Sequence, residues 1–442
     1  VRMVQELVGH DGVIWVMRFS ADARLLASGG RDGVLRVWSV YWYSPARLNT
    51  VNAAAGTTPL PSAAGPLYSA PAGGPTAGTG PPSAGAGAAA AASGGPAAQP
   101  GPSASLRPPL LSESPLLTLT GHSGDILDVA WSQCRLLLTA SADQTARLWY
   151  AEGGGECLRS FVHPDFVTSC CFHPSEPRRI VTGCADGKVR VWSVPDGSVV
   201  CTATVQQDLV TRVLFSYDGG RVVAGTLRGK ARYYEYTGSG LDYVAQLDVK
   251  NQHGSGRKVT GLAQVPYMYG NDQMYIITSA DSRIRLYTGY QQERKFKGHR
   301  HTNTQIAASL SPSCQHLICG SDDGWVYLWA TGLPPPPPPP GAAGGGGSAG
   351  AAAADKASKG GRKEARGSKV KEGMYESFQT PEQTTTVAVI APEVCRLGRG
   401  LERPTGGATE RREASSAPLL GALVVVAGFS GRIFVYENLP LM

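Results

Sequence analysis

The sequence lacks the short motifs that usually indicate a catalytic or metal site. It contains no Gly-x-x-x-x-Gly-Lys phosphate loop, no Gly-x-Ser-x-Gly nucleophile elbow and no His-Glu-x-x-His pattern. None of its nine cysteines belongs to a Cys-x-x-Cys pair, and alternation along a strand places Cys170 and Cys171 on opposite faces. We therefore expect a protein that is not an enzyme and that uses neither a metal nor a cofactor.

A secretory signal and a long apolar run are also missing. Residues 419–429 are apolar but fall short of the ~20 residues that a membrane span needs, and they indicate a buried strand instead. Cysteines without a secretory signal point to reduced thiols. These features predict a cytoplasmic protein with at most a peripheral association with membranes.

Charge is almost absent from one long segment. Residues 51–110 contain a single charged side chain, Arg107, among many Ala, Gly, Pro and Ser residues. Such a composition buries too little apolar surface to offset the entropy of the chain. We expect residues 44–114 to be a disordered insertion, residues 334–372 to be a Pro/Gly-rich and then basic insertion, and residues 393–417 to be a polar loop insertion.

Basic charge is concentrated in the second insertion. Residues 356–371 carry seven basic side chains and one acidic side chain, so they contribute +6 (seven minus one) to the net charge of +7. A solvated spacer explains this run, and contact with acidic lipid or nucleic acid is the alternative. Because the rest of the chain is about neutral and shows no basic stripe, we expect no nucleic-acid partner.

What the sequence does contain is a repeated segment. Residues 139–149, TASADQTARLW, and 182–192, TGCADGKVRVW, each place an aspartate four residues after a threonine and a tryptophan six residues further on. Residues 28–38 have the same form, and four looser copies follow. Copies without insertions are spaced by 42 or 43 residues, within the range of a four-stranded propeller blade. The seven closing aromatic residues are Trp38, Trp149, Trp192, Tyr234, Tyr287, Trp329 and Tyr436.

Each copy has the pattern of short strands joined by tight turns. In the third copy, residues 178–184 and 188–194 flank Asp186-Gly187, a dipeptide typical of hairpin turns. Residues 166–174 and 156–161 supply two further strands. Such sheets bury their faces only by stacking on neighbours around a ring, so we expect residues 1–442 to form one all-β domain.

The repeats resemble those of WD-repeat β-propellers. Glycine-histidine pairs typical of that family occur at residues 9–10, 121–122 and 298–299. The resemblance implies a seven-bladed propeller in which a His, a Ser or Thr, an Asp and a Trp form a hydrogen-bonded tetrad within a blade. Indole N–H can only donate, the hydroxyl and imidazole can do both, and the carboxylate accepts. The complete tetrads are His10, Ser28, Asp32 and Trp38; His122, Thr139, Asp143 and Trp149; and His163, Thr182, Asp186 and Trp192.

Four copies depart from this pattern. Arg228 and Ser430 occupy the aspartate position of the fourth and seventh copies, and Cys319 occupies the hydroxyl position of the sixth. In the fifth copy the hydroxyl of Thr278 lies one residue late, and the Trp-Asp dipeptide that names the family occurs nowhere. We expect these blades to depend more on packing.

The last copy has only three strands of its own. Residues after the closing strand are too few to form a fourth, whereas residues 2–7 precede Gly9-His10 as outer strands precede that pair elsewhere. We therefore expect the N-terminal strand to pair with residues 432–437 and to close the ring.

Two stretches are similar to a particular subfamily. Residues 256–261, GRKVTG, and 281–287, DSRIRLY, resemble the subfamily of WD-repeat-containing protein forty-four, which is described as rabphilin-like and Rab-binding. The resemblance implies an adaptor in endosomal recycling and vesicle transport, associated with a Rab GTPase at endosomal or Golgi membranes. In that subfamily the Rab-contacting part lies largely before the propeller, so we expect Rab binding to involve residues before Val1.

Two other functions stay open. A substrate receptor of a cullin-type ubiquitin ligase usually ends a blade with Trp-Asp-x-Arg, but the residues three past the tryptophans are Tyr41, Glu152, Pro195 and Gly332. A propeller subunit of a nuclear complex would bind chromatin or RNA, which the neutral ring supports little.

The face that carries the His and Asp turns is the expected docking face, here called the upper face. All three insertions are expected on the opposite side, which leaves the upper face clear for a protein partner rather than a small-molecule substrate. Ordinary exposed turns are the alternative interpretation. The candidate partner-binding residues are Val13, Arg31, Asp125, Asp165, Phe166, Leu209, Arg228 and Asp322.

Overall fold

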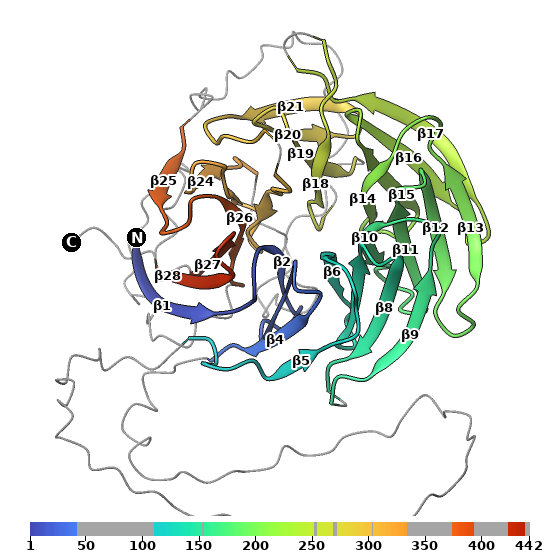
Figure 1. Ribbon diagram of the computed structural model, residues 1–442. Helices are drawn as coiled ribbons and strands as arrows, with labels where there is room; N and C mark the ends of the chain where they lie inside the picture. Colours follow the sequence, from blue (N-terminus) through green and yellow to red (C-terminus); the bar gives the residue numbers. More distant parts are fainter. Residues whose placement is uncertain are drawn as a thin grey trace, which may run out of the picture. The chain divides into compact units, whose positions relative to one another are not determined.

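The chain folds into a ring of seven sheets. The computed structural model describes residues 1–41, 110–152, 154–251, 254–267, 272–302, 304–333, 374–392 and 423–437. Every regular element in these ranges is a strand, and the 28 strands form seven antiparallel four-stranded sheets. The sheets follow one another around a central axis as the blades of a propeller (Figure 1). The predicted all-β, seven-bladed architecture is confirmed.

The strands of each blade run outward from the axis in chain order. Blade one holds β2 (Ile14–Phe19), β3 (Leu25–Gly30), β4 (Leu35–Ser39) and β5 (Leu117–Leu119). Blade two holds β6 (Ile126–Trp131), β7 (Leu136–Ser141), β8 (Thr145–Tyr150) and β9 (Cys157–Val162). Blade three holds β10 (Val167–Phe172), β11 (Arg179–Cys184), β12 (Lys188–Ser193) and β13 (Val199–Thr204). Blade four holds β14 (Val210–Phe215), β15 (Arg221–Thr226), β16 (Lys230–Tyr236) and β17 (Leu241–Asp248).

The remaining three blades follow the same order, except that the last takes its outer strand from the N-terminus. Blade five holds β18 (Val259–Gln264), β19 (Met274–Ser279), β20 (Arg283–Thr288) and β21 (Gln291–Phe296). Blade six holds β22 (Ser309–Leu310), β23 (His316–Cys319), β24 (Trp325–Ala330) and β25 (Glu376–Gln379). Blade seven holds β26 (Thr385–Ile390), β27 (Leu423–Gly428), β28 (Arg432–Glu437) and β1 (Arg2–Val8).

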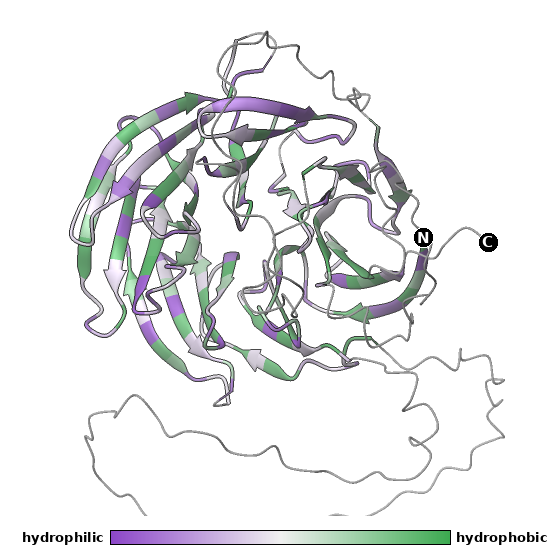
Figure 2. Cartoon of the chain, turned by 180° about the vertical axis from the view of Figure 1, so that it is seen from behind, coloured by the Kyte–Doolittle hydropathy of each residue, from purple (hydrophilic) through white to green (hydrophobic). Residues whose placement is uncertain are grey.

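Burial changes from the axis to the rim. The second strands are covered on both faces by neighbouring blades, and β27, with the sequence LVVVAG, is buried at every residue. The outer strands are half exposed, and the rim strand β21 is largely hydrophilic (Figure 2). The core therefore lies between blades: Trp38, fully buried, shares one apolar cluster with Leu7 and Ile433 of blade seven.

Polar contacts around the axis also join neighbouring blades. The hydroxyl of Thr168 in β10 donates to the Val210 carbonyl of the next blade at 2.9 Å, and Thr211 in β14 donates to Val259 at 2.6 Å. Thr386 in β26 donates to the Ile14 carbonyl at 2.5 Å, which links the last blade to the first. In each case the second residue of an inner strand bonds to the first residue of the following inner strand.

One buried carboxylate bridges four inner strands. Asp128 in β6 accepts a 2.7 Å hydrogen bond from the hydroxyl of Ser169 in β10. Its oxygens also lie 3.1 Å from a guanidinium nitrogen of Arg212 in β14 and 3.7 Å from one of Arg18 in β2. The Asp128 residue is 3% exposed, so its carboxylate contacts these protein groups rather than bulk water. Blades one to four are therefore tied together beside the axis.

The first strand closes the ring, as the sequence predicts. β1 pairs antiparallel with β28, from Arg2 opposite Glu437 to Val8 opposite Arg432. The side chain of Gln5 makes three further hydrogen bonds of 2.8 to 2.9 Å, to the backbone of Leu110 and Leu111. The closing strand therefore contacts blade one as well as completing blade seven.

The predicted disordered insertion 44–114 is wrong at its C-terminal end. Leu110 and Leu111 are buried at 6% and 2% exposure, and Leu111 forms a β-bridge with Val40. Two adjacent leucines supply apolar surface that the Ala/Gly/Pro segment lacks, and Gln5 satisfies their backbone groups. Residues 44–109 and the insertions 334–372 and 393–417 lie outside the described residues.

We expect removal of residues 1–8 to lower the free energy of unfolding by about 3 kcal/mol or more, because β28 loses a whole ladder of hydrogen bonds. Hydrogen exchange should accelerate in both β28 and the Leu110–Leu111 segment. Gln5→Ala is the matched control: it removes only the side-chain bonds, so exchange should accelerate near Leu111 and stay unchanged in β28. Unchanged exchange of residues 432–437 after the truncation would contradict closure by β1.

Candidate interaction site

A hydrogen-bonded chain runs from the core of blade one to its upper turn. The indole Nε1 of Trp38 donates to Ser28 Oγ at 2.9 Å, and Ser28 Oγ lies 2.8 Å from His10 Nε2. His10 Nδ1 lies 3.0 Å from Asp32 Oδ1. The structure therefore brings the four sequence-predicted residues of this blade together.

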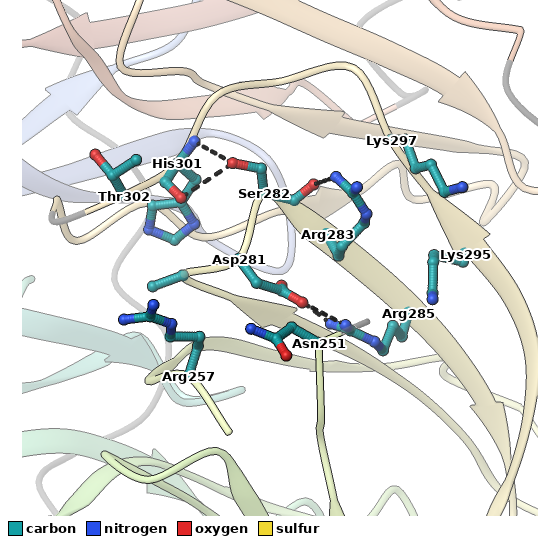
Figure 3. A pocket seen from close by; sticks show the side chains of 11 residues that line it. Asn251, Arg257, Asp281, Ser282, Arg283, Arg285, Lys295, Lys297, His301 and Thr302 are labelled. Atoms are coloured by element: carbon teal, nitrogen blue, oxygen red, sulfur yellow. Dashed lines mark hydrogen bonds and ion pairs between the residues drawn. The ribbon is translucent and has the colours of Figure 1, made fainter. Parts of the chain in front are cut away.

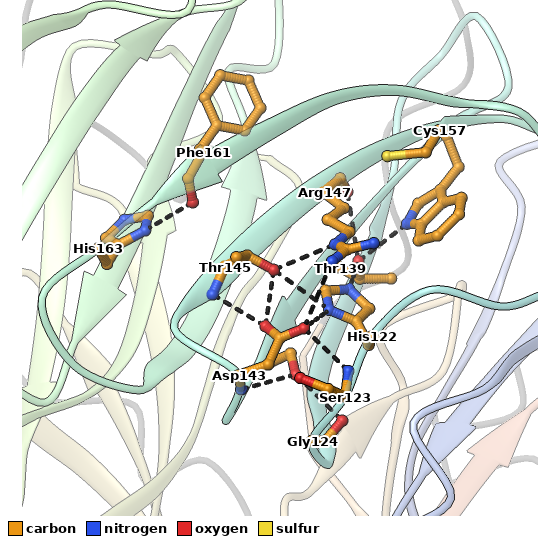
Figure 4. Close-up of polar contacts among 12 residues, drawn as sticks. His122, Ser123, Gly124, Thr139, Asp143, Thr145, Arg147, Cys157, Phe161 and His163 are labelled. Atoms are coloured by element: carbon orange, nitrogen blue, oxygen red, sulfur yellow. Dashed lines mark hydrogen bonds and ion pairs between the residues drawn. The ribbon is translucent and has the colours of Figure 1, made fainter.

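Blade two repeats this geometry (Figure 4). Trp149 Nε1 donates to Thr139 Oγ1 at 2.9 Å, and His122 Nε2 lies 2.7 Å from the same oxygen. His122 Nδ1 lies 2.7 Å from Asp143 Oδ2. A single direction of donation fits: indole to hydroxyl, hydroxyl to Nε2, and Nδ1–H to carboxylate.

The hydrogen bonds of this tetrad stabilise a neutral imidazole beside an ionised carboxylate. Burial raises the pKa of Asp143, but hydrogen bonds from Thr145 and His122 outweigh it and lower that pKa to about 2. Burial lowers the pKa of His122. Thr139 is fully buried, as are Ser28 and Thr182, so no substrate can reach these hydroxyls despite their resemblance to a hydrolase triad.

The prediction that Asp186 belongs to the tetrad of blade three is wrong. Trp192 Nε1 and His163 Nε2 both lie 2.8 Å from Thr182 Oγ1. His163 Nδ1, however, lies 3.0 Å from the Phe161 carbonyl, so this carbonyl takes the place of Asp186 (Figure 4). The carboxylate pairs with Arg190 at 2.5 Å instead. Both ring nitrogens of His163 are satisfied without Asp186.

Sequence reasoning missed the arginine that competes for the turn carboxylate. In blades one, two, three and five an arginine four residues after the aspartate approaches it, at distances from 2.5 to 3.8 Å. The signal was visible, because five copies have Arg two residues before the closing aromatic. In blade four, where Arg228 replaces the aspartate, the buried Nε of Arg232 has no partner among the described residues. These arginines are Arg36, Arg147, Arg190, Arg232 and Arg285.

Blade six shows what the loss of the hydroxyl does. With Cys319 in place of Ser or Thr, the indole of Trp329 donates to the Lys297 carbonyl at 2.9 Å. Neither ring nitrogen of His299 has a hydrogen-bond partner in the described part of the chain. Burial, together with the neighbouring His301, lowers the pKa of His299 to about 3. His299 is retained as an aromatic filler, with its ring edge-on to Trp329 at 5.6 Å.

Blade seven replaces the histidine and aspartate with a different pair. Ser430 occupies the aspartate position, and its backbone N–H donates to Glu382 Oε2 at 3.1 Å. The Ser430 hydroxyl also donates to this carboxylate. Glu382 is buried at 7% exposure and precedes β26 as histidines precede other inner strands. The upper turn of this blade is therefore held by a polar network that the sequence pattern did not reveal.

Three of the eight candidate docking residues are buried or hydrogen-bonded within the ring. Val13 is 8% exposed, so its prediction as an exposed docking residue is wrong; it belongs to the buried entry into β2. Asp125 accepts a 2.9 Å hydrogen bond from the indole of Trp15. Asp322 accepts two bonds from Thr302, at 2.8 and 2.9 Å, and a shorter one from Thr304.

The other candidates differ in exposure. Phe166 and Leu209 are 50% and 42% exposed, and Arg31 and Arg228 are exposed. Asp165 is partly exposed and accepts a 2.7 Å bond from the N–H of Phe166. The upper-face residues that sequence reasoning missed are Leu227 and Phe429, at 42% and 43% exposure, and Trp15, whose ring lies edge-on to Phe429.

The repeats match a known family. The chain matches the family described as WD domain, G-beta repeat, over residues 2–39, 113–150, 155–193 and 290–330. Each range starts at an outer strand and ends just after a closing tryptophan. The chain is a WD40-repeat β-propeller. Propellers of this family typically bind proteins and are typically non-catalytic.

The WD40 propeller is similar to three curated proteins. WD repeat-containing protein 44 of Xenopus laevis is 33% identical over 345 residues, which are 75% of this chain and 35% of that protein. An uncharacterized WD repeat-containing protein of Schizosaccharomyces pombe is 28% identical over 324 residues, 72% of this chain and 47% of that protein. The 2-deoxy-glucose resistant protein 2 of Saccharomyces cerevisiae is 29% identical over 235 residues, 47% and 27% of the two chains. The chain thus spans less than half the length of each relative.

The described residues include neither a membrane-spanning helix nor a cluster of metal-binding side chains. No helix in these ranges has the length and apolar character to cross a membrane. The same ranges contain no group of three or more His, Cys, Asp or Glu side chains arranged to hold a metal ion.

We expect Asp143→Ala and Asp186→Ala to differ in their effect on the WD40 propeller. Asp143→Ala leaves the buried Nδ1–H of His122 with only the Thr145 hydroxyl, 3.3 Å away, as an acceptor and should cost about 2–4 kcal/mol of unfolding free energy. Asp186→Ala leaves His163 bonded and should cost about 1–2 kcal/mol, from the lost Arg190 pair. Chemical denaturation at pH 7 measures both values. Equal costs would contradict the distinction between the two blades.

The unpartnered His299 predicts an acid-sensitive blade six. Its folded-state pKa lies below the unfolded value of 6.5, so its contribution to stability is full above pH 6.5 and declines as the pH falls toward 3. His299→Phe should leave stability nearly unchanged at pH 7 and raise it by roughly 2–3 kcal/mol at pH 4.5 relative to the parent.

His122→Phe is the matched control for this experiment, because it removes two hydrogen bonds and should destabilise the protein at pH 7. Denaturation curves of the parent, His299→Phe and His122→Phe proteins at pH 7 and pH 4.5 measure these changes in stability. A His299→Phe protein that is much less stable at pH 7 would show that the imidazole has a partner.

Proposed function

We propose that the chain is a non-enzymatic scaffold that docks a protein partner on its upper face. One observation supports this most: apolar side chains stand exposed on neighbouring upper loops. Phe166, Leu209 and Leu227 are 42% to 50% exposed, and the N–H of Leu227 donates to the Leu209 carbonyl at 3.0 Å. Apolar residues gathered on a rigid surface often indicate a protein-binding site.

The rigidity of these loops supports the same function. Leu209 joins β13 to β14, and Leu227 lies in the turn between β15 and β16. Asp208 accepts hydrogen bonds from the N–H of Leu209 and of Arg228, so one carboxylate connects the two loops. A partner that binds here loses little free energy to the ordering of the loops.

We further propose that this scaffold acts in endosomal recycling or vesicle transport, in the cytoplasm and in association with a Rab GTPase. Similarity to WD repeat-containing protein 44 over 75% of this chain supports the proposal, together with the subfamily-like residues 256–261 and 281–287. The chain lacks the blade-ending arginine that is usual in a ligase substrate receptor. It also lacks the basic ring that would support a role in a nuclear complex.

Capture from extract separates these functions. The immobilised protein, with the residues before Val1 that Rab binding is expected to involve, should retain endosomal Rab GTPases several-fold more strongly when the extract is loaded with a non-hydrolysable GTP analogue than with GDP. A cullin-ligase adaptor should not be retained in either state. Retention of that adaptor, or a Rab signal without nucleotide dependence, would contradict the proposal.

The docking face has its own test. Phe166→Asp combined with Leu209→Asp should abolish retention of the partner and leave the melting temperature within a few degrees, because both side chains are exposed. Val199→Asp combined with Tyr243→Asp, at 44% and 60% exposure on rim strands, is the matched control and should bind normally. Loss of binding only in the rim variant would move the site to the rim.

A further inference from the structure

Blade five holds a pocket of about 390 Å³ with an unusual concentration of basic side chains (Figure 3). Arg283 and Arg285 come from β20, Lys295 and Lys297 from β21 and the residue after its end, and Arg257 from the loop before β18. Neither the match to the WD-repeat family nor the proposed scaffold function accounts for this pocket.

The strand register forces like charges together. Arg285 pairs directly with Lys295 across β20 and β21, and Arg283 and Lys297 each lie two residues further along the same faces. Like charges directly opposite each other in a sheet destabilise it. Burial lowers the pKa of Lys295, and repulsion from Arg285, Lys297 and Arg283 lowers it further. The arrangement therefore opposes folding unless an anion offsets it.

The one acidic side chain among the described lining residues is already neutralised. Asp281 lies 2.5 Å from Arg285 and accepts a 2.7 Å hydrogen bond from Ser279. Arg257, Lys295 and Lys297 have no carboxylate within ion-pair distance among the residues that the structure describes. Five cations and one carboxylate leave a net charge of +4 (five minus one) with His301 neutral.

Two buried polar side chains make this a preformed site rather than a scatter of surface lysines. Arg285 is 1% exposed and is fixed by Ser279, Asp281 and the Lys250 carbonyl. His301 is fully buried; its Nε2 lies 3.0 Å from the Thr304 carbonyl, while its Nδ1 has no partner in the described ranges.

The size, charge and lining of the pocket define its ligand. A phosphate monoester carries about −1.5 to −2 at neutral pH, so a charge of +4 matches two or more phosphates. No Phe, Tyr or Trp is among the described lining residues, so a nucleobase has no ring to stack on, and the hydroxyls of Ser282 and Thr302 already bond to the His301 carbonyl and to Asp322. We propose that the pocket binds a compact polyol with several phosphates, an inositol polyphosphate, either free or as the headgroup of a phosphoinositide.

The sequence supports a specific rather than a general feature. Arg257 and Arg283 lie in the subfamily-like residues 256–261 and 281–287, outside every range that matches the WD-repeat family, whereas Arg285 is the arginine that recurs in five blades. The tetrad of an ordinary blade does not require these cations. The pocket does not include Phe166, Leu209 or Leu227, so its tests are separate from those of the upper-face proposal.

Calorimetry with inositol hexakisphosphate and with inositol 1,4,5-trisphosphate tests the site on the full chain. Arg257→Ala, Lys295→Ala and Lys297→Ala together should weaken binding by at least about 30-fold. The matched control is the triple variant Arg24→Ala, Arg31→Ala and Lys188→Ala, which loses the same charge from turns of blades one and three and should weaken binding less than about threefold.

Melting curves at low salt supply a second readout. Without ligand, the pocket variant should melt no lower than the parent, because like-charge repulsion is relieved. Either inositol phosphate should raise the melting temperature of the parent and the control but not of the pocket variant. An equal loss of binding in both variants, or no binding of either probe at millimolar concentration, would overturn the proposal.

Vesicles distinguish the two sources of the ligand. Flotation with vesicles containing phosphatidylinositol 4,5-bisphosphate, compared with phosphatidylserine vesicles of equal charge, should reveal pocket-dependent binding if the headgroup is lipid-borne. Binding of the soluble phosphates alone supports the same pocket with a free ligand. Equally tight binding of ATP, or pocket-independent binding to phosphatidylserine, would overturn the assignment to inositol phosphates.

Discussion

The pairing of β1 with β28 is the constraint on which the whole ring depends. Each blade buries its two faces only against its neighbours, so a ring with an incomplete seventh blade would expose two sheet edges. The chain solves this by bringing together segments up to 435 positions apart, such as Arg2 and Glu437 (437 minus 2). Contacts of such long range form slowly, because the loop-closure entropy is lost before the contact energy is gained. The inner hydroxyl-to-carbonyl bond from Thr386 to Ile14 joins the same two blades near the axis.

In blades one and two, a series of hydrogen-bonded polar side chains connects the core to the upper turn. Where the chain is complete, as from Trp149 to Asp143, the carboxylate fixes the turn from which a partner would be contacted. Where it is replaced, other groups keep the turn in place, as Glu382 does for Ser430. The family fold therefore conserves the position of the upper turns while the residues that hold them change. Their exposed side chains are free to differ in chemistry from blade to blade.

The sequence predicted the architecture because aromatic spacing and alternation are properties of one blade at a time. It predicted closure because the seventh copy has only three strands of its own, one short of the four that a blade needs. It failed where the outcome depends on competition between partners: nothing in the spacing says that Asp186 prefers Arg190 to His163, or that His299 loses both partners. It failed at Val13 and Leu111 because their burial depends on neighbouring segments that periodicity does not identify. The basic pocket was also hidden, since it arises from the register between Arg285 and Lys295 rather than from either strand alone.

The carboxylate of Asp128 has a consequence for how this ring opens. Because it binds groups from blades two, three and four and lies near Arg18 of blade one, these blades share one buried electrostatic centre. Arg212 extends this centre to blade five through a 2.8 Å hydrogen bond to the Thr260 carbonyl, whereas blade six is outside it and has the shortest first two strands, with two residues in β22 and four in β23. Partial unfolding begins in the regions with the fewest buried contacts. We therefore expect two cooperative units. The blades around Asp128 should form one stable unit, and a less stable unit that includes blade six should unfold first when the protein is destabilised.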